Sequence, residues 1–406
     1  MQRLSRLFTI TAASAAVALM AAGCGSSTTG GGGSSASSSP TGRPAPPAMT
    51  AATAVGEGEG ELNLIAWAGY AENGSTDPAV DWVTPFTDAT GCKVNVKIGN
   101  TSDEMVTLMK TGQYDGVSAS GDATLRLIYG GDVAPVNTDL VPNYATISDF
   151  LKLKPWNSVN DVAYGIPHGW GANVLAWNTA AVTTAPTSMG ALFDPNSPYK
   201  GKISIYDAPT YIADAALYLM RTKPDLKITN PYALDDTQFA AAVDLLKQQR
   251  PLVSSYWADY THQVASFDSQ ESVLGTSWQV NVNLINADAK VKVDSAVASE
   301  GATGWSDTWM LASKAAHPNC MYKWMDWITS PKVNDQVAEW FGEAPAQTKA
   351  CDVATAGFCD QFHALDAAYA DSIYYWTTPT ANCLDGRGDI CKDYAAWVQA
   401  WTEIKG

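Results

Sequence analysis

Residues 61–98 read ELNLIAWAGYAENGSTDPAVDWVTPFTDATGCKVNVKI, and this stretch decides the fold class. Residues 61–67 have the alternating and apolar pattern of a strand, which Gly69 and Gly74 end. Residues 80–91 place apolar side chains at helical spacing before a glycine stop, and residues 92–98 alternate strictly as a second strand. A strand, a helix and a strand in this order predict a parallel sheet, and hence an α/β protein.

The same alternation continues along the chain. Residues 105–110 are expected to form a short helix, and residues 114–121 a strand that leads into a loop of small residues. Residues 172–178 predict another strand. Residues 200–207 begin a second α/β unit, whose helix is expected at about 211–221. The chain is long enough for two domains with cores of their own.

The N-terminus has the layout of an exported lipoprotein. Residues 1–23 carry Arg3 and Arg6 before an apolar run, which is typical of a secretory signal peptide. The segment AAGC, which ends at Cys24, resembles a bacterial lipobox, although Ala21 stands where leucine is usual. The resemblance implies lipidation of Cys24. Residues 24–60 are expected to form a Gly/Ser/Pro tether, which would hold the protein outside the cytoplasm, on the outer face of the bacterial cell membrane.

Six cysteines remain once Cys24 is set aside, and an even number in an exported chain predicts three disulfide bonds. Two of the expected pairs close short local loops, and the third follows by elimination. A zinc site is not expected, because CxxC spacing is absent and the four histidines are scattered. The expected pairs are Cys351 with Cys359, Cys383 with Cys391, and Cys92 with Cys320.

Composition and motifs limit the function classes. The formal net charge is −16 at pH 7, and a surface of this sign repels nucleic acid and favours cations. The 15 tryptophans and 17 tyrosines suit ligand-facing surfaces as well as cores. No nucleophile, base and orienting group form a recognisable set, and no Gly-x-Ser-x-Gly motif or phosphate loop appears. We therefore expect neither an enzyme nor a cofactor.

The segment GWSDTW, residues 304–309, sets an aspartate between two tryptophans. These residues are either core positions of a strand with Asp307 capping a turn, or part of a ligand site. In a site, Trp305 would offer a flat wall and Asp307 a negative charge, which together suit a cationic organic ligand.

Several short segments, taken in order, resemble the spermidine/putrescine-binding proteins of bacterial ABC importers. The resemblance covers residues 61–377 and rests on the order and spacing of the segments, since each alone recurs in the wider superfamily. The segments are LIAWAGY (64–70), TGCKV (90–94), YD (114–115), GIPHGWG (165–171), YKG (199–201), Trp278 and WSD (305–307).

The resemblance implies a two-lobed periplasmic-binding-protein fold, type II-like, with the ligand cleft between lobes joined by strand crossovers. Lobe one would be residues 61–173 plus 306–351, and lobe two residues 174–305 plus 352–406. The implied function is that of a monomer that captures a polyamine and delivers it to the permease subunits of an ABC importer.

The resemblance also implies the ligand site. Polyamines are methylene chains with ammonium groups, so a site needs apolar walls, carboxylates and aromatic faces. Asp307 would meet an amine, and Glu343 would neutralise a second one. Asp122 either adds a charge or caps the helix that follows it. The expected ligand-binding residues are Trp67, Tyr70, Ser120, Asp122, Asp207, Trp278, Trp305, Asp307 and Glu343.

Some positions depart from the family pattern and leave other ligands open. In the segment DAPTY, residues 207–211, only Asp207 is acidic, and Thr377 stands where an amide is expected. Tyr374 and Tyr375 are adjacent, as in iron-binding relatives, although they suit packing equally well. The alternatives are a binding protein for a sugar, thiamine or ferric iron and, from another class, an exported glycosidase, whose paired carboxylates are not identifiable here.

Overall fold

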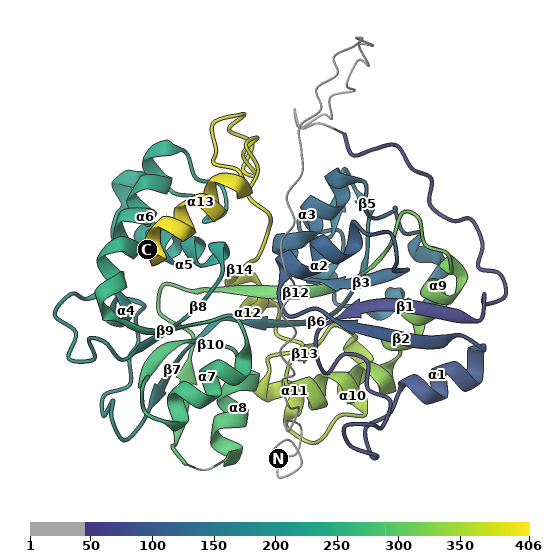
Figure 1. Cartoon of the computed structure of the whole chain (residues 1–406), viewed down its shortest axis with the longest axis horizontal. Coiled ribbons are helices and arrows are strands. Elements are labelled where there is room, and N and C mark those ends of the chain that lie inside the picture. Colours follow the sequence, from purple (N-terminus) through teal and green to yellow (C-terminus); the bar gives the residue numbers. More distant parts are fainter. Residues whose placement is uncertain (1–44, 289) are drawn as a thin grey trace, which may run out of the picture.

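Two α/β lobes lie side by side in the computed structural model, which describes residues 45–288 and 290–406 (Figure 1). The expected signal peptide, residues 1–23, and the expected lipidation site, Cys24, lie outside the described residues. Within the described ranges, no helix has the length and apolar character needed to cross a membrane.

The sheet of lobe one has the strand order β13-β6-β12-β3-β1-β2, with β14 also paired to β12. Strand β1 runs parallel to both β2 and β3, which confirms the parallel sheet predicted from residues 61–98. Strand β12 runs antiparallel to β6 and β3 and lies in the middle of the sheet. The strands are β1 Glu61–Ala66, β2 Lys93–Ile98, β3 Gly116–Ala119, β6 Ile166–Ala172, β12 Ala302–Leu311, β13 Ala344–Pro345 and β14 Ile373–Tyr375.

Glycine and proline residues mark the ends of several helices of lobe one. Gly91 follows α1 with φ of 74°, a left-handed conformation that glycine adopts without strain. Prolines occupy the first positions of α9 and α10, where the missing N–H costs no hydrogen bond. The helices are α1 Val83–Thr90, α2 Ser102–Met109, α3 Gly121–Gly130, α9 Pro318–Ile328 and α10 Pro331–Phe341. Strands β4 Ser158–Val159 and β5 Val162–Ala163 form a separate antiparallel ribbon.

Lobe two is built on a second sheet with the order β11-β7-β10-β8-β9. Strand β8 lies between β10 and β9 and is parallel to both, and α5 follows it close to the range expected from the sequence. Its strands are β7 Val174–Asn178, β8 Ile203–Tyr206, β9 Val253–Trp257, β10 Leu274–Ser277 and β11 Val293–Ala296. Its helices are α4 Gly190–Phe193, α5 Ile212–Thr222, α6 Asp236–Gln249, α7 Tyr260–Asp268, α8 Gln279–Asp288 and α13 Tyr394–Lys405.

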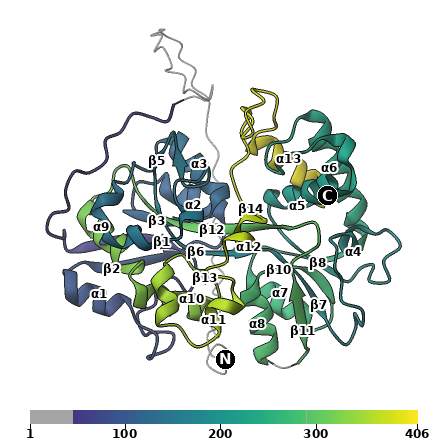
Figure 2. The ribbon, with the colours of Figure 1, turned by 180° about the vertical axis from the view of Figure 1, so that it is seen from behind.

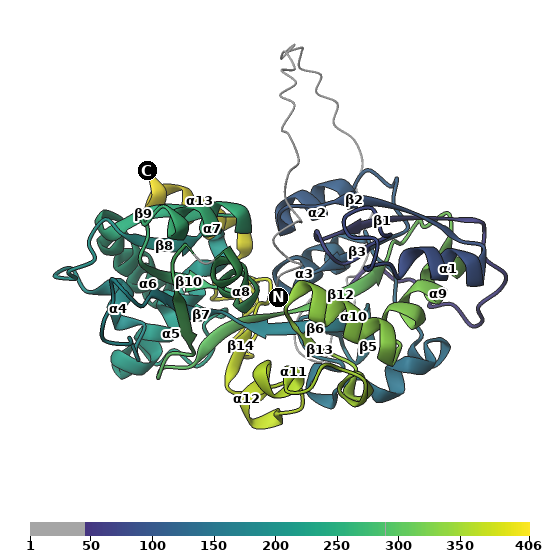
Figure 3. The same cartoon turned by 90° about the horizontal axis from the view of Figure 1, so that it is seen from below.

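Three chain segments cross between the lobes, and they lie against one another (Figure 3). Strand β6 of lobe one passes through Asn173 into β7 of lobe two, and β12 returns the chain to lobe one. The third segment follows β14 and leads to α13 in lobe two. The backbone N–H of Asn173 donates to the carbonyl of Thr303 at 2.8 Å, and that of Trp376 donates to the carbonyl of Gly304 at 2.7 Å. The crossovers therefore form one hydrogen-bonded hinge.

The lobes divide differently from the ranges expected in the sequence. Residues 302–305 were expected in lobe two, but they pair within the sheet of lobe one as the start of β12. Short helices α11 Phe358–Gln361 and α12 Ala367–Asp371 precede β14, which also joins that sheet. Only the end of the chain reaches lobe two, where α13 packs near α6 (Figure 2). Strand pairing across the sheet, which local sequence does not encode, decides this division.

The described part of the expected tether lies against lobe one. Ala52 and Val55 pack on the apolar core of that lobe. The side chain of Asn137 donates to the carbonyl of Ala52 at 3.1 Å, and the N–H of Gly56 donates to Asn319 at 2.7 Å. The last part of the segment before β1 is therefore bound to the lobe surface.

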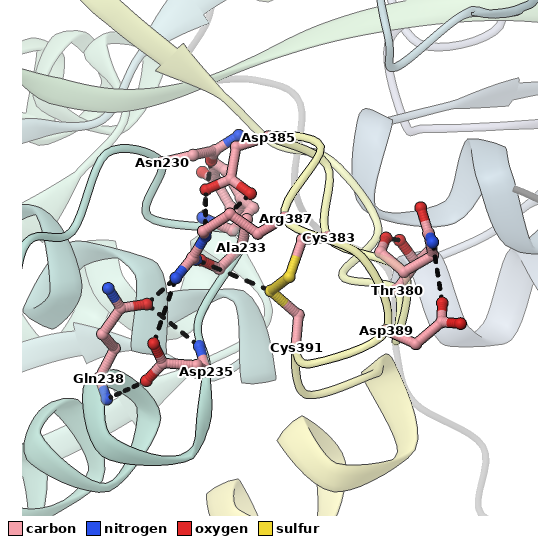
Figure 4. The surroundings of a disulfide bond; sticks show 12 residues. Asn230, Ala233, Asp235, Gln238, Thr380, Cys383, Asp385, Arg387, Asp389 and Cys391 are labelled. Carbon is pink, nitrogen blue, oxygen red and sulfur yellow. Dashed lines mark hydrogen bonds and ion pairs between the residues drawn. A yellow bond between two sulfur atoms is a disulfide. The ribbon is translucent and has the colours of Figure 1, made fainter. Parts of the chain in front are cut away.

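All three expected disulfide pairs are confirmed: Cys92 with Cys320, Cys351 with Cys359, and Cys383 with Cys391. The last pair closes a loop that Arg387 joins to lobe two (Figure 4). The Arg387 guanidinium forms an ion pair with Asp235 at 3.1 Å and with Asp385 at 2.9 Å. Asp235 also caps α6, so the loop is attached to the start of that helix.

Loss of the long-range disulfide is expected to destabilise the protein more than loss of a local one. Cys92 and Cys320 are 228 residues apart, whereas Cys351 and Cys359 are 8 apart. Chain-entropy arguments then predict losses of about 5 and about 2.5 kcal/mol for the two double alanine variants. Equilibrium unfolding in denaturant, followed by tryptophan fluorescence, measures both. Equal losses would contradict the argument.

Candidate ligand-binding site

A cavity of about 250 Å³ lies between the lobes. Trp67 and Ser120 line it from lobe one, and Trp278 lines it from lobe two. Trp305 and Asp307 line it from β12, beside the hinge. A largely apolar cavity with a few polar groups between two domains is typical of a small-molecule site.

Strand geometry brings Trp305 and Asp307 to the same side of β12. Alternate residues of a strand face the same way, and both side chains line the cavity. Gly171 pairs with Trp305 across β6, and a Cβ atom at Gly171 would lie 2.9 Å from the Trp305 ring. The glycine thus leaves room for the indole.

Asp307 is 3% exposed, and two hydroxyl groups lie within hydrogen-bond distance of its carboxyl group. The hydroxyl of Ser120 donates to Oδ1 at 2.5 Å, and that of Tyr70 lies 2.8 Å from Oδ2. The same Tyr70 hydroxyl also lies 2.8 Å from Oε2 of Glu343, which is 1% exposed. Tyr70 therefore bridges two buried carboxyl groups.

The phenol of Tyr70 has one hydrogen, so it donates to only one of the two carboxyl groups. The other contact needs a proton on a carboxyl group, which then donates to the phenol oxygen. The pKa directions agree with a proton on one of the two carboxyl groups. Burial raises the pKa of Asp307 to about 7. Burial, and then the nearby charge of Asp307, raise the pKa of Glu343 well above its usual range. At least one of the two groups is neutral in the empty protein.

His168 lies beside Glu343 but does not supply a positive charge. Its Nδ1 is 3.7 Å from Oε1 of Glu343, and burial lowers the pKa of the imidazole to about 3. Gly169 makes room for the carboxyl group, because a Cβ atom there would approach it to 2.1 Å. The HGWG segment thus provides space for both Glu343 and Trp305.

The structure brings together most of the residues predicted for the site. Tyr70 and Glu343 lie directly behind Asp307 and contact it through the Tyr70 hydroxyl. The predicted residues that line the cavity are Trp67, Ser120, Trp278, Trp305 and Asp307. Their contact with a ligand remains a prediction.

The other two predicted residues lie outside the cavity wall. Asp122, in the first turn of α3, accepts a hydrogen bond from Ser102 at 2.9 Å, and burial raises its pKa to about 6. Asp207 forms an ion pair with Lys405 at 2.7 Å and accepts a hydrogen bond from Trp401 at 2.8 Å. Its charge is therefore already matched by α13.

Several cavity residues were not predicted from the sequence. Trp376 follows the crossover strand β14, and Trp340 and Phe341 end α10. Glu72, which is 9% exposed, also lines the cavity. Phe341 stands two residues before Glu343, and Trp376 directly follows Tyr374 and Tyr375. The sequence signal for these residues was their position next to segments that had already been singled out.

Two α/β lobes around a cleft beside a three-segment hinge define the class of two-lobed solute-binding proteins. Residues 81–360 match the family of bacterial extracellular solute-binding proteins, and the chain therefore belongs to that family.

Relatives of known name agree with this assignment. The spermidine/putrescine-binding periplasmic protein of Escherichia coli is 25% identical over 295 residues, which cover 70% of this chain and 81% of that protein. The putrescine-binding periplasmic protein SpuD of Pseudomonas aeruginosa is 23% identical, with coverage of 68% and 76%. The structure of the spermidine/putrescine transporter substrate-binding protein PotD of Streptococcus pneumoniae aligns with a TM-score of 0.66 and 16% identity, over 85% of this chain and 99% of that one. The first two are named as periplasmic binding proteins, and the third as the substrate-binding protein of an ABC transporter.

Asp307→Asn is expected to stabilise the empty protein at alkaline pH. The pKa of Asp307 is about 7 in the folded protein and about 4 in an unfolded chain. Between these values the folded state holds the extra proton, so rising pH removes stability. The free energy of unfolding of the variant should therefore exceed that of the wild type by about 4 kcal/mol at alkaline pH and match it in acid.

Denaturant unfolding across the pH range measures this difference. Asp244→Asn, which alters an exposed carboxyl on α6, is the control and should leave the profile unchanged. A destabilised Asp307→Asn at alkaline pH would mean that the carboxylate is charged and stabilised in the empty site.

Proposed function

We propose that this protein captures a polyamine outside the cytoplasm, as a monomer, and delivers it to the permease of an ABC importer. The observation that carries the proposal is the buried carboxyl of Asp307, which lines the cavity beside Trp305 and has no basic partner among residues 45–288 and 290–406. A buried carboxylate without a cation is costly, so a cationic ligand would supply the missing charge.

The cavity wall as a whole supports a cation. Asp307, Glu72 and Asp259 contribute carboxyl groups to it, and among the described lining residues none is a lysine, arginine or histidine. The tryptophans offer apolar area to a methylene chain and attract ammonium groups by about 0.5 to 2 kcal/mol each. The relatives with polyamine-binding names are consistent with this chemistry.

The hinge supports capture by closure. Trp67 and Trp278 come from opposite lobes, so a ligand that contacts both favours the closed arrangement. The permease would then recognise that closed form. The three hydrogen-bonded crossovers allow the lobes to move while the site on β12 keeps its geometry.

Carboxyl geometry argues against a glycosidase. Such an enzyme needs two carboxyl groups that flank a scissile bond across an open site. Glu343 instead lies behind Tyr70, which bridges it to Asp307. Glu343 therefore does not line the cavity, so it cannot flank a bound ligand opposite Asp307.

A thermal-shift screen with polyamines, sugars, amino acids, thiamine and ferric citrate tests the proposal. A ligand that binds only the folded state raises the melting temperature. Spermidine or putrescine should raise it, and Asp307→Asn should weaken that binding about 10- to 100-fold, because it removes a charge-assisted hydrogen bond. Asp244→Asn should bind as the wild type does. A shift with a sugar or ferric citrate and none with amines would overturn the ligand.

We also propose that a lipid on Cys24 anchors the protein to the outer face of the cell membrane, as the lipobox-like segment indicates. Cys24→Ala is expected to release the protein from the membrane fraction, because a thioether-linked lipid can no longer form. Fractionation and immunoblotting of cells that express each form measure this. Retention of the variant with the membranes would refute the anchor.

A further inference from the structure

Glu343 is a buried carboxyl group that lies behind the cavity wall. It is 1% exposed and stands two residues after the end of α10. Its Oε2 lies 2.8 Å from the Tyr70 hydroxyl, whereas its Oε1 has no hydrogen-bond partner in the described part of the chain. One hydroxyl group therefore separates Glu343 from Asp307, which does line the cavity.

The ring of Tyr70 is fixed by its neighbours. It is 0% exposed, and it packs edge-on against the His168 ring at 4.3 Å between centroids and against the Phe341 ring at 4.5 Å. The hydroxyl is thereby held between the two carboxyl groups. Because it has one hydrogen, it donates to one carboxyl group and accepts a hydrogen bond from the other.

The surroundings of the two carboxyl groups decide which one keeps a proton. Asp307 accepts a hydrogen bond from Ser120 at 2.5 Å and borders the cavity, whereas Glu343 has only the contact with Tyr70. Hydrogen bonds donated to a carboxylate favour its ionised form, and burial favours the neutral form. The pKa directions agree, since burial raises that of Asp307 to about 7 and that of Glu343 well above its usual range. Asp307 therefore ionises first.

The other titratable groups nearby do not favour a charge on Glu343. His168 lies 3.7 Å from Oε1, but burial lowers the pKa of the imidazole to about 3, so the ring is neutral. Asp122 is itself acidic and raises the pKa of Asp307. Glu339, one turn earlier in the chain, is also an acid. Within residues 45–288 and 290–406, no lysine or arginine forms an ion pair with Glu343 or Asp307.

We propose that Glu343 is a positioning residue that keeps its proton in both the empty and the ligand-bound protein. Its neutral carboxyl group donates to the Tyr70 oxygen, so that Tyr70 reserves its own hydrogen for Asp307. The Asp307 carboxylate then has two donors, Tyr70 and Ser120, and this end of the cavity presents one negative charge to one ammonium group. The part that concerns the ligand rests on the proposed cation-binding function. Glu343 itself then neutralises no second amine.

Infrared spectroscopy of the intact, empty protein tests the proton on Glu343, because neutral carboxyl groups absorb apart from carboxylates. A pH of about 8.5 ionises the buried groups whose pKa is about 6 to 7, namely Asp122, Asp214 and Asp307. We expect a neutral-carboxyl band in the wild type that disappears in Glu343→Gln. Glu271→Gln, which alters an exposed glutamate, should keep the band. A wild type without the band, or Glu343→Gln with the same band, would overturn the proposal.

Titration with spermidine at a pH of about 6 tests the ligand-bound state. Calorimetry in two buffers of different ionisation enthalpy counts the protons released on binding. Asp307 holds a proton in the empty protein at this pH and loses it to the ammonium group, so release should approach one proton in the wild type and in Glu343→Gln. Asp307→Asn should release none. The affinity of Glu343→Gln should stay within about 3-fold of the wild type, because the amide also donates to Tyr70.

Glu343→Met, which fills the space without a donor, separates positioning from packing. It should weaken spermidine binding about 3- to 10-fold, since the Tyr70 oxygen loses its hydrogen bond. Equal affinities of the Met and Gln variants would overturn the positioning role. A loss of about 10-fold or more in Glu343→Gln would mean that a ligand amine meets a charge on Glu343, and would also overturn it. Absence of binding by every amine would overturn the proposed function, while the infrared spectra still locate the proton.

Discussion

Burial of carboxyl groups that have no basic partner in the described part of the chain is the constraint on which the site depends. Asp307 and Glu343 share the single hydrogen of the Tyr70 hydroxyl, so a further proton has to reside on one of them. In the empty protein a proton neutralises at least one of these groups, and a cationic ligand would take over that role. Binding of a cation is therefore coupled to proton release. The affinity for the cation then depends on the pH and on the pKa of each carboxyl group.

The fold positions this chemistry with one strand. Strand β12 lies in the middle of the lobe-one sheet and begins at the hinge, so its side chains lie close to both lobes. Hydrogen bonds connect Trp278 to Asn173, Asn173 to Thr303, and Thr303 to Asp214. Trp278 and Asp214, which belong to lobe two, are thereby linked to the same strand that carries Asp307.

Sequence reasoning found the part of the site that short segments encode. Trp305 and Asp307 share a strand face, and the glycines of HGWG leave the space that Trp305 and Glu343 occupy. Asp207 was expected at the cleft from the resemblance to the polyamine-binding proteins, but α13 returns from the end of the chain and places Lys405 beside it.

The sequence by itself determined the α/β class, the alternation of strands and helices, the cysteine pairs and the residues of the Trp305–Asp307 face, because periodicity, glycine stops and short loops are local properties. Only the tertiary structure decided which strands share a sheet, where the lobes divide, and which carboxyl groups remain without a cation. These outcomes depend on contacts between residues far apart in the chain, such as Asp207 with Lys405 and Tyr70 with Glu343.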